Sequence, residues 1–183
     1  MPTSVERAIH DHFLKHDLFF KTHIDNYLKW IPFAAVAIAH LSGVKTRSSW
    51  RRETIVAATT EGIRYFLVNG LKNITTERRP IPYFDKRSFP SGHTSAAFSA
   101  AQFMHRELKE SFPYLSYLGY ASALAAGFLR LMKNRHWLKD VLAGMLIGWL
   151  SAKMAFLIIP GLAVKIQLTE QKKIDNLSQE LRT

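Results

Sequence analysis

The chain has 183 residues, enough for one domain with a sizeable core, and no shift in composition divides it. It contains no cysteine, which excludes thiolate catalysis, disulfides and cysteine metal sites. The formal net charge of +11 predicts anionic partners, namely nucleic acid, an anionic membrane surface or a phosphorylated substrate. We therefore treat residues 1–183 as one unit.

The first segment, residues 1–26, places apolar residues among charges at helical spacing from residue 5 onward. This pattern predicts an amphipathic helix at a membrane interface, because the segment is too polar to span a bilayer. No apolar run in it has the length of a cleavable signal peptide.

The core, residues 27–163, contains five apolar segments that predict membrane-spanning helices. They are Tyr27–Val44, Thr54–Leu71, His93 to about Leu108, Tyr114–Met132 and Leu138–Ile159. No strand-like alternation occurs, so we expect an all-α integral membrane bundle of about five spanning helices. The alternative is a soluble helical bundle, since the mean hydropathy is only −0.06. The number of long apolar runs with aromatic ends argues against it.

Polar and small residues predict how these helices pack. Glu61 and Arg64 are three residues apart, hence on one helical face, which should look into the bundle rather than toward lipid. The third segment is short and rich in Ala and Ser, which places it at the centre. The fifth carries Gly144, Gly148 and Ser151 on one face, and Pro160-Gly161 is expected to end it. Residues 164–183 then form a polar tail.

If the five helices cross the membrane one after another, the second helix ends and the third begins on one side of it. The fourth helix ends and the fifth begins on that same side. The charged residues at these four helix ends should therefore meet in space. Lys and Arg are almost equally numerous on the two sides, so charge alone leaves the orientation open.

The first charged cluster follows the second helix. Lys72 and Arg79 are separated by six residues, and Pro80 stops any helix after the arginine. A lysine point charge and a planar arginine fork are complementary ways of holding phosphate oxygens. Basic loops beside membranes more often bind lipid headgroups or nothing, so this pair alone identifies no site.

The second cluster, Pro90-Ser91-Gly92-His93, lies where the third helix should begin. Backbone N–H groups at a helix N-terminus favour an anion there. Gly92 permits close approach of a ligand, Ser91 offers a hydroxyl, and His93 is a candidate proton donor to a leaving oxygen. The alternative is a helix-capping serine beside a surface histidine.

The third cluster is Arg130, His136 and Asp140. His136 and Asp140 are four residues apart, which on a helix places the carboxylate beside the imidazole and leaves the other ring nitrogen free to attack. An ordinary interfacial histidine paired with an acid is the alternative interpretation.

Together the three clusters resemble the three-part signature of the type-2 phosphatidic acid phosphatases, a superfamily that includes vanadium haloperoxidases and bacterial class A acid phosphatases. The matching elements are Lys72-x6-Arg79-Pro80, Pro90-Ser91-Gly92-His93 and Arg130-x5-His136-x3-Asp140. The resemblance covers Lys72 to Asp140 and, through helix order, most of the chain beyond residue 27. Leu129 stands where the family usually has Ser, which removes one hydroxyl.

The resemblance implies that His136 is a nucleophile forming a phosphohistidine, that Asp140 orients it, and that His93 protonates the leaving group and later activates water. It implies that the phosphoryl oxygens are bound by Lys72, Arg79, Ser91, Gly92 and Arg130. No metal or other cofactor is expected, because three cations would already surround the phosphate.

The expected function is therefore a membrane-embedded phosphatase acting on a phospholipid or isoprenoid phosphate, without nucleic acid as a partner. Candidate substrates are undecaprenyl diphosphate, phosphatidylglycerol phosphate, phosphatidic acid and lipid A phosphates. By resemblance to bacterial members, the protein is expected in the inner membrane with its site facing the periplasm. The alternatives are a soluble acid phosphatase or vanadium haloperoxidase relative, and a non-catalytic binder or transporter of an anionic lipid.

Overall fold

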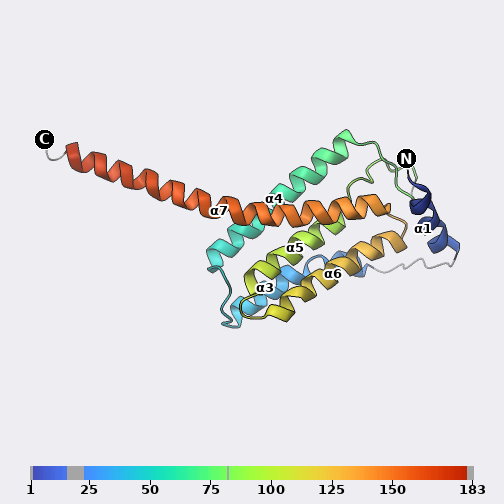
Figure 1. Cartoon of the computed structure of the whole chain (residues 1–183), viewed down its shortest axis with the longest axis horizontal. Coiled ribbons are helices and arrows are strands. Elements are labelled where there is room, and N and C mark those ends of the chain that lie inside the picture. The colour runs from blue at the N-terminus through green and yellow to red at the C-terminus, as the bar shows by residue number, and fades with distance from the viewer. Residues whose placement is uncertain (1, 16–22, 82, 181–183) are drawn as a thin grey trace.

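The computed structural model describes residues 2–15, 23–81 and 83–180, with side chains described up to residue 159. All regular structure in these residues is helical, which confirms the all-α class (Figure 1). The helices are α1 (Ser4–Lys15), α2 (Ile24–Leu28), α3 (Ile31–Leu41), α4 (Trp50–Ile74), α5 (Gly92–Leu108), α6 (Pro113–Met132) and α7 (Leu138–Glu180).

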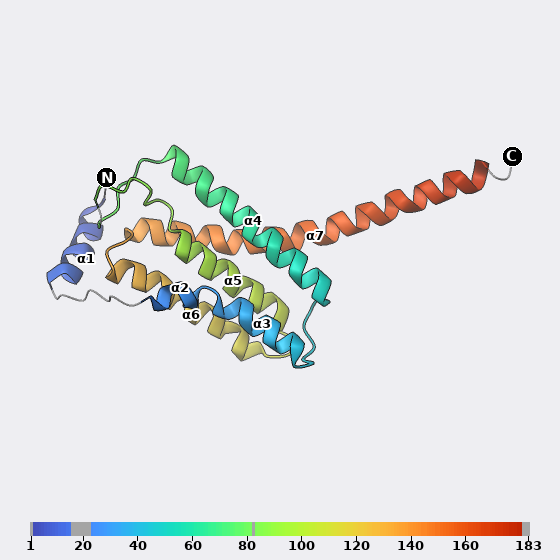
Figure 2. The same ribbon diagram turned by 180° about the vertical axis from the view of Figure 1, so that it is seen from behind.

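Helix α5 is the centre of the bundle, as its Ala- and Ser-rich sequence predicts. It packs most extensively against α6 and α7, and also against α3 and α4. Every side chain from Thr94 to Met104 is buried. Helices α3, α4, α6 and α7 lie around it in both views of the molecule (Figures 1 and 2).

Small residues on α7 allow it to lie unusually close to α5. A Cβ atom on Gly144 would be 2.6 Å from the carbonyl oxygen of Ser91, and one on Gly148 would be 2.1 Å from that of Ser95. Both distances are shorter than van der Waals contact, so only glycine fits at these positions. The predicted small-residue face of the fifth helix is thus confirmed as a packing surface.

The polar pair on α4 faces this core, as predicted. Arg64 Nη2 is 2.6 Å from Glu61 Oε2, and the Oγ of Ser99 donates to the other Glu61 oxygen at 2.7 Å. Arg64 also donates to the Oγ of Ser95 at 3.4 Å. The pair therefore joins α4 to α5, where each charge has a partner.

The expected first spanning helix, Tyr27–Val44, is wrong as a continuous element. A turn at Lys29 and Trp30 separates α2 from α3, and Pro32 lies in the first turn of α3. Proline fits the first turn of a helix, where its missing N–H is not needed, so α3 starts afresh there. At about 1.5 Å per residue, α3 is roughly half as long as a bilayer core is thick.

Two further expectations need correction. Pro160-Gly161 does not end the fifth helix, since α7 continues to Glu180 and projects beyond the bundle (Figure 1). A proline removes one helical hydrogen bond and can be tolerated within a long helix. The predicted N-terminal helix over residues 5–26 is not one continuous helix: α1 is described over Ser4–Lys15, and His23 lies outside a helix, directly before α2. Residues 16–22 lie outside the described part of the chain.

Among the helices of the described residues, only Leu138–Ile159 within α7 is long and apolar enough to cross a membrane by length and composition, with a hydropathy of 1.9. The count of five spans is therefore not confirmed. The predicted convergence of helix ends is confirmed: α4 and α6 end, and α5 and α7 begin, at one end of the bundle, where α1 also lies (Figures 1 and 2).

The close contact of α7 with α5 generates a stability prediction. We expect Gly148→Ala to destabilise the protein by about 1–3 kcal/mol or more, because the new methyl group overlaps the Ser95 carbonyl. Gly62→Ala on α4 is the matched control, since a Cβ there meets nothing within 4 Å. Thermal unfolding in detergent measures both, and equal unfolding temperatures for the two variants would contradict the packing account.

Candidate active site

The start of α7 is organised by a buried carboxylate. Asp140, which is fully buried, lies in the first turn, and its Oδ2 accepts the backbone N–H of Trp137 at 2.9 Å and the hydroxyl of Ser88 at 2.5 Å. The bond to Trp137 is the return arm of a capping box, in which the third residue of a helix binds the residue before the first. The helix N-terminus further stabilises the negative charge.

His136 lies beside this carboxylate, in the turn that precedes the helix rather than on the helix itself. Its Nδ1 is 3.5 Å from Asp140 Oδ2, longer than a good hydrogen bond. Nδ1 thus faces the acid, which leaves Nε2 as the nitrogen available for chemistry. Sequence spacing correctly predicts the contact, although the two residues do not share a helix.

His136 is 4 % exposed, and this burial decides its charge. Burial lowers the pKa of His136 to about 4, although Asp140 raises it, and the charges of Arg79 and Lys72 lower it further. The imidazole is therefore neutral at neutral pH. A neutral ring nitrogen has a free lone pair, which a nucleophile requires.

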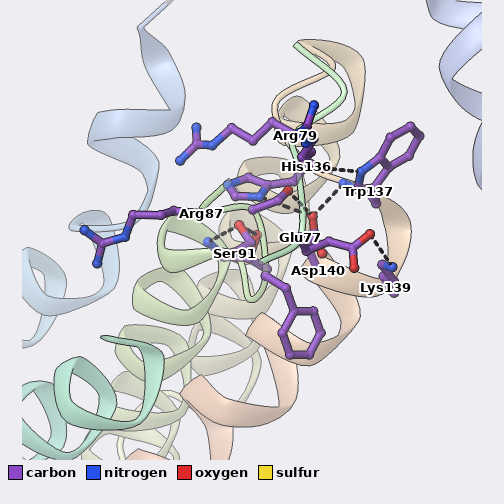
Figure 3. A network of polar contacts seen from close by, with 12 residues as sticks. Glu77, Arg79, Arg87, Ser91, His136, Trp137, Lys139 and Asp140 are labelled. Atoms are coloured by element: carbon purple, nitrogen blue, oxygen red, sulfur yellow. Dashed lines mark hydrogen bonds and ion pairs between the residues drawn. The ribbon is translucent and has the colours of Figure 1, made fainter. Parts of the chain in front are cut away.

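Lys72 and Arg79 lie near this imidazole. Lys72 donates to the carbonyl oxygen of Arg87 at 2.6 Å, and Arg79 Nε is 2.9 Å from an oxygen of Asp85. Burial lowers the pKa of the Lys72 ammonium to about 8, and the Arg79 charge acts in the same direction. Arg79 and Arg87 extend to the same side of the network, away from Lys139 (Figure 3).

The loop between α4 and α5 is tied to the turn between α6 and α7. The indole N–H of Trp137 donates to the carbonyl oxygen of Arg78 at 2.8 Å, and Lys139 pairs with Glu77 at 2.8 Å. The N–H of Ser91 donates to the Asp140 carbonyl at 2.9 Å. The predicted meeting of the separate charged clusters is thus observed in the structure (Figure 3).

Ser91 and Gly92 form the N-terminus of α5. The buried Ser91 hydroxyl is 2.9 Å from that of Thr94 and accepts the Thr94 N–H, so it caps the helix. The structure agrees in part with both interpretations of this motif. The serine caps the helix, as the alternative interpretation predicted, and the motif also forms the helix N-terminus that an anion site requires. Gly92 and His93 occupy the first helical positions, whose N–H groups have no partner within a helix.

His93 and Arg130 are held by α2, a contact that sequence reasoning missed. The Nε2–H of His93 donates to the side-chain oxygen of Asn26 at 2.7 Å. Asp25, which is 1 % exposed, pairs with Arg130 Nη1 at 3.0 Å and also with Lys133. Burial alone would raise the pKa of Asp25, but Lys133 and Arg130 hold it below its usual range.

The N-terminal segment also contacts the turn between α6 and α7 and the start of α7. Glu6 of α1 accepts the backbone N–H of Lys139 at 3.0 Å, and His10 is 2.8 Å from the side-chain oxygen of Asn134. A cavity of about 730 Å³ lies between α1 and the α4–α5 loop, with Arg7, His10 and Arg78 among its lining residues. For the contacts of α2 with His93 and Arg130, the only sequence signal was the Asp25-Asn26 pair directly before the apolar run that begins at Tyr27.

Three predicted site residues have their partners in one network: His136 and Asp140 contact each other, and Ser91 binds the Asp140 backbone. Lys72 and Arg79 act electrostatically on His136, and both Arg130 and His136 act on His93. The described residues contain no cluster of three or more His, Asp or Glu side chains placed to hold a metal ion. A phosphate group would instead meet cations and helix N–H groups.

Comparison with known proteins agrees with this geometry. Lipid A 1-phosphatase of Porphyromonas gingivalis is 34 % identical over 138 residues, which are 75 % of this chain but only 31 % of that protein. The chain thus spans about a third of the length of this curated relative.

Two crystal structures have the same fold. One, of LpxE from Aquifex aeolicus, has a TM-score of 0.59 at 19 % identity and covers 83 % of this chain and 92 % of that one. The other is the first transmembrane PAP2 type phosphatidylglycerolphosphate phosphatase from Bacillus subtilis, with a TM-score of 0.53 at 18 % identity, covering 90 % and 89 %. The sequence model of the PAP2 superfamily matches residues 53–162, which include all three clusters. The chain belongs to the PAP2 superfamily, the superfamily of the type-2 phosphatidic acid phosphatases.

Proposed function

We propose that this protein is a membrane phosphatase that hydrolyses a lipid phosphate or diphosphate through a phosphohistidine at His136. One observation carries the proposal. His136, a buried and neutral histidine, lies beside the Asp140 carboxylate. The charges of Lys72 and Arg79 are close enough to act on it electrostatically, and so is His93.

In the first step, Nε2 of His136 attacks the phosphorus atom. The bond from phosphorus to the lipid oxygen breaks. The negative phosphate of the bound substrate favours the imidazolium form of His93, whose Nε2–H, which here donates to Asn26, supplies the proton to that oxygen and leaves a neutral ring. As Nε2 of His136 gives up its lone pair, the ring gains positive charge, which the nearby Asp140 carboxylate stabilises.

In the second step, His93 removes a proton from a water molecule, whose oxygen attacks the phosphorus. The nitrogen–phosphorus bond breaks, His136 recovers its lone pair and inorganic phosphate leaves. Lys72, Arg79, Arg130 and the N–H groups of Gly92 and His93, which follow the capping Ser91, stabilise the charge on the phosphoryl oxygens in both steps. These preorganised donors supply the electrostatic stabilisation without a bound metal.

A lipid A phosphate is the first substrate to test. A relative with 34 % identity is named for that activity, although this chain covers only 31 % of its length. The polar cavity between α1 and the α4–α5 loop could accept a bulky sugar headgroup beside the phosphate, and Arg7 and His10 offer hydrogen bonds there. Undecaprenyl diphosphate, phosphatidylglycerol phosphate and phosphatidic acid complete the panel.

We also propose that residues 1–183 act as one phosphatase domain in a bacterial inner membrane, with the site facing the periplasm. Leu138–Ile159 supplies one clear span, and in this arrangement the more polar α4, α5 and α6 cross beside it while α2 and α3 together make the first pass. α1 then lies along the membrane surface over the site.

Phosphate release by the purified protein in detergent tests the function, using this panel of lipids. We expect His136→Ala to lower kcat by at least about 10³-fold, because the nucleophile is lost. His23→Ala is the control, since His23 is exposed at the start of α2 and makes no capping bond. Vanadate should compete with substrate, as a mimic of the phosphoryl transition state.

The alternatives give different results. Full activity of His136→Ala would contradict the phosphohistidine mechanism, and unchanged lipid binding with no turnover by the wild type would indicate a binding protein. Release of the protein from membranes by salt alone would support the soluble relatives instead.

The pH dependence of kcat/KM follows from two of the site groups whose pKa values are shifted, His136 and Lys72. His136, with a pKa of about 4, is neutral and nucleophilic above that pH, whereas Lys72, with a pKa of about 8, is charged and binds phosphate below it. We expect kcat/KM to fall above about pH 8 in the wild type. Lys72→Arg should move this fall to higher pH, because arginine stays charged. An alkaline limb at the same pH in both proteins would rule out Lys72 as its source.

The ion pair between Asp25 and Arg130 predicts that Asp25 positions the arginine for phosphate binding. Asp25→Asn removes the charge that holds Arg130, so we expect kcat to fall roughly 10- to 100-fold while KM changes less. Asp25→Glu should recover part of the loss, because it restores the charge. Glu110→Gln, which removes an exposed partner of Arg47, is the matched ion-pair control. A kcat for Asp25→Asn equal to that of Glu110→Gln would show that Arg130 needs no such support.

A further inference from the structure

A second charged pocket lies at the opposite end of the bundle from His93. We call it the distal pocket; its volume is about 520 Å³, and it is lined by Gln102, His105, Arg106, Lys109, Tyr117, Tyr120, Trp149 and Lys153. His105 follows His93 by twelve residues on α5, a distance of roughly 18 Å at 1.5 Å per residue. The lining residues of α6 come from its start, whereas Arg130 lies near its end.

The charge of the distal pocket is entirely positive. Arg106, Lys109 and Lys153 contribute cations, and no Asp or Glu lines it. Among the described residues, no recorded ion pair neutralises these three cations. Three unneutralised cations around one hollow favour an anion with several oxygens.

An apolar groove continues from this pocket. Its volume is about 400 Å³, and its lining consists of Phe98, Tyr120, Leu142, Met145, Leu146 and Trp149. Tyr120 and Trp149 line both hollows, so the charged pocket and the groove adjoin. The groove forms because α6 and α7 each pack along α5 but contact each other far less.

The groove has the length and direction that a hydrocarbon chain needs. Leu142 and Trp149 are seven residues apart on α7, which corresponds to roughly 10 Å along the helix, in the direction of the catalytic end. An aliphatic chain of several carbons would lie along these apolar side chains. Its apolar surface would be buried there, which favours binding.

We propose that the distal pocket and groove bind an anionic phospholipid, with its phosphate between Arg106, Lys109 and Lys153 and one acyl chain in the groove. The proposal rests on the membrane placement proposed above and assigns the lipid to the leaflet opposite the active site. It concerns a bound regulator or structural lipid, since the residues of the reaction lie at the other end of α5.

The pocket discriminates against zwitterionic lipids. A choline or ethanolamine headgroup carries an ammonium that needs a carboxylate or a free aromatic face. The lining offers no carboxylate, and Lys153 already covers the Trp149 ring, with its Nζ 3.7 Å from the ring centroid. A phosphatidylglycerol headgroup brings no such cation, so its single negative charge is fully matched.

Native mass spectrometry of the full chain in detergent, with phosphatidylglycerol or phosphatidylcholine added, tests this directly. Saturating vanadate keeps lipid out of the catalytic site. We expect phosphatidylglycerol to remain bound with roughly tenfold preference, as about 1.4 kcal/mol from the matched charges implies. Inorganic phosphate alone should not compete at similar concentrations, because it lacks the acyl chain.

The triple variant Arg106→Gln, Lys109→Gln, Lys153→Gln should lose this preference. The control is Lys45→Gln, Arg51→Gln, which removes two exposed cations outside the pocket, near the ends of α3 and α4 that face the same side. Bound phosphatidylglycerol should also raise the unfolding temperature of the wild type and the control, since a ligand that binds only the folded state stabilises it. The triple variant should show no such rise.

Several outcomes would overturn the proposal. Equal retention of the two lipids by the wild type would do so, as would an unchanged preference in the triple variant. If the triple variant does not fold, Lys153→Gln alone replaces it and should still lower the preference. Efficient competition by inorganic phosphate would indicate a simple anion site instead. Phosphate release is scored separately. A triple variant that keeps turnover but loses the lipid preference supports both proposals. A wild type that prefers phosphatidylglycerol but releases no phosphate from any lipid counts against the proposed function alone.

Discussion

The carboxylate of Asp140 joins the parts of the molecule that must meet at the site. The carboxylate accepts the Trp137 N–H, which caps the start of α7, and the Ser88 hydroxyl, which holds the α4–α5 loop. It also lies beside His136. The backbone carbonyl of the same residue accepts the N–H of Ser91. A buried charge of this kind is tolerated only with several donors, and here each donor comes from a segment that carries site residues. The same bonds that keep the charge buried therefore set the geometry around His136.

This arrangement depends on how closely α7 approaches α5. Gly144 and Gly148 leave no room for a side chain between α7 and the backbone of Ser91 and Ser95. With any larger residue, the start of α7 would move away from the start of α5, and the Ser91–Asp140 bond would lengthen. The small-residue surface of α7 thus has two effects. It allows α7 to pack closely against α5, and it positions the polar groups of the site at the start of both helices.

The sequence predicts the parts of the site that depend on fixed spacing. His136 and Asp140, four residues apart, do meet, and the convergence of helix ends follows from counting passes. What it could not predict depends on contacts between distant segments: Asn26 reaches His93, and Asp25 pairs with Arg130 from a short helix whose pattern resembles ordinary surface sequence. Local rules also failed at Pro160, where a long helix tolerates one missing hydrogen bond.

In the proposed mechanism the phosphate is transferred to one ring nitrogen, Nε2 of His136, and trapping the intermediate tests this most directly. The purified protein would be mixed with a radiolabelled lipid phosphate, quenched in alkali within a single turnover and digested, and the labelled peptide identified by mass spectrometry. We expect the phosphate on the peptide that contains His136, stable to alkali and lost in acid, as a nitrogen–phosphorus bond should be. Label on another residue, or single-turnover hydrolysis with no labelled peptide at any time point, would contradict the central role of His136.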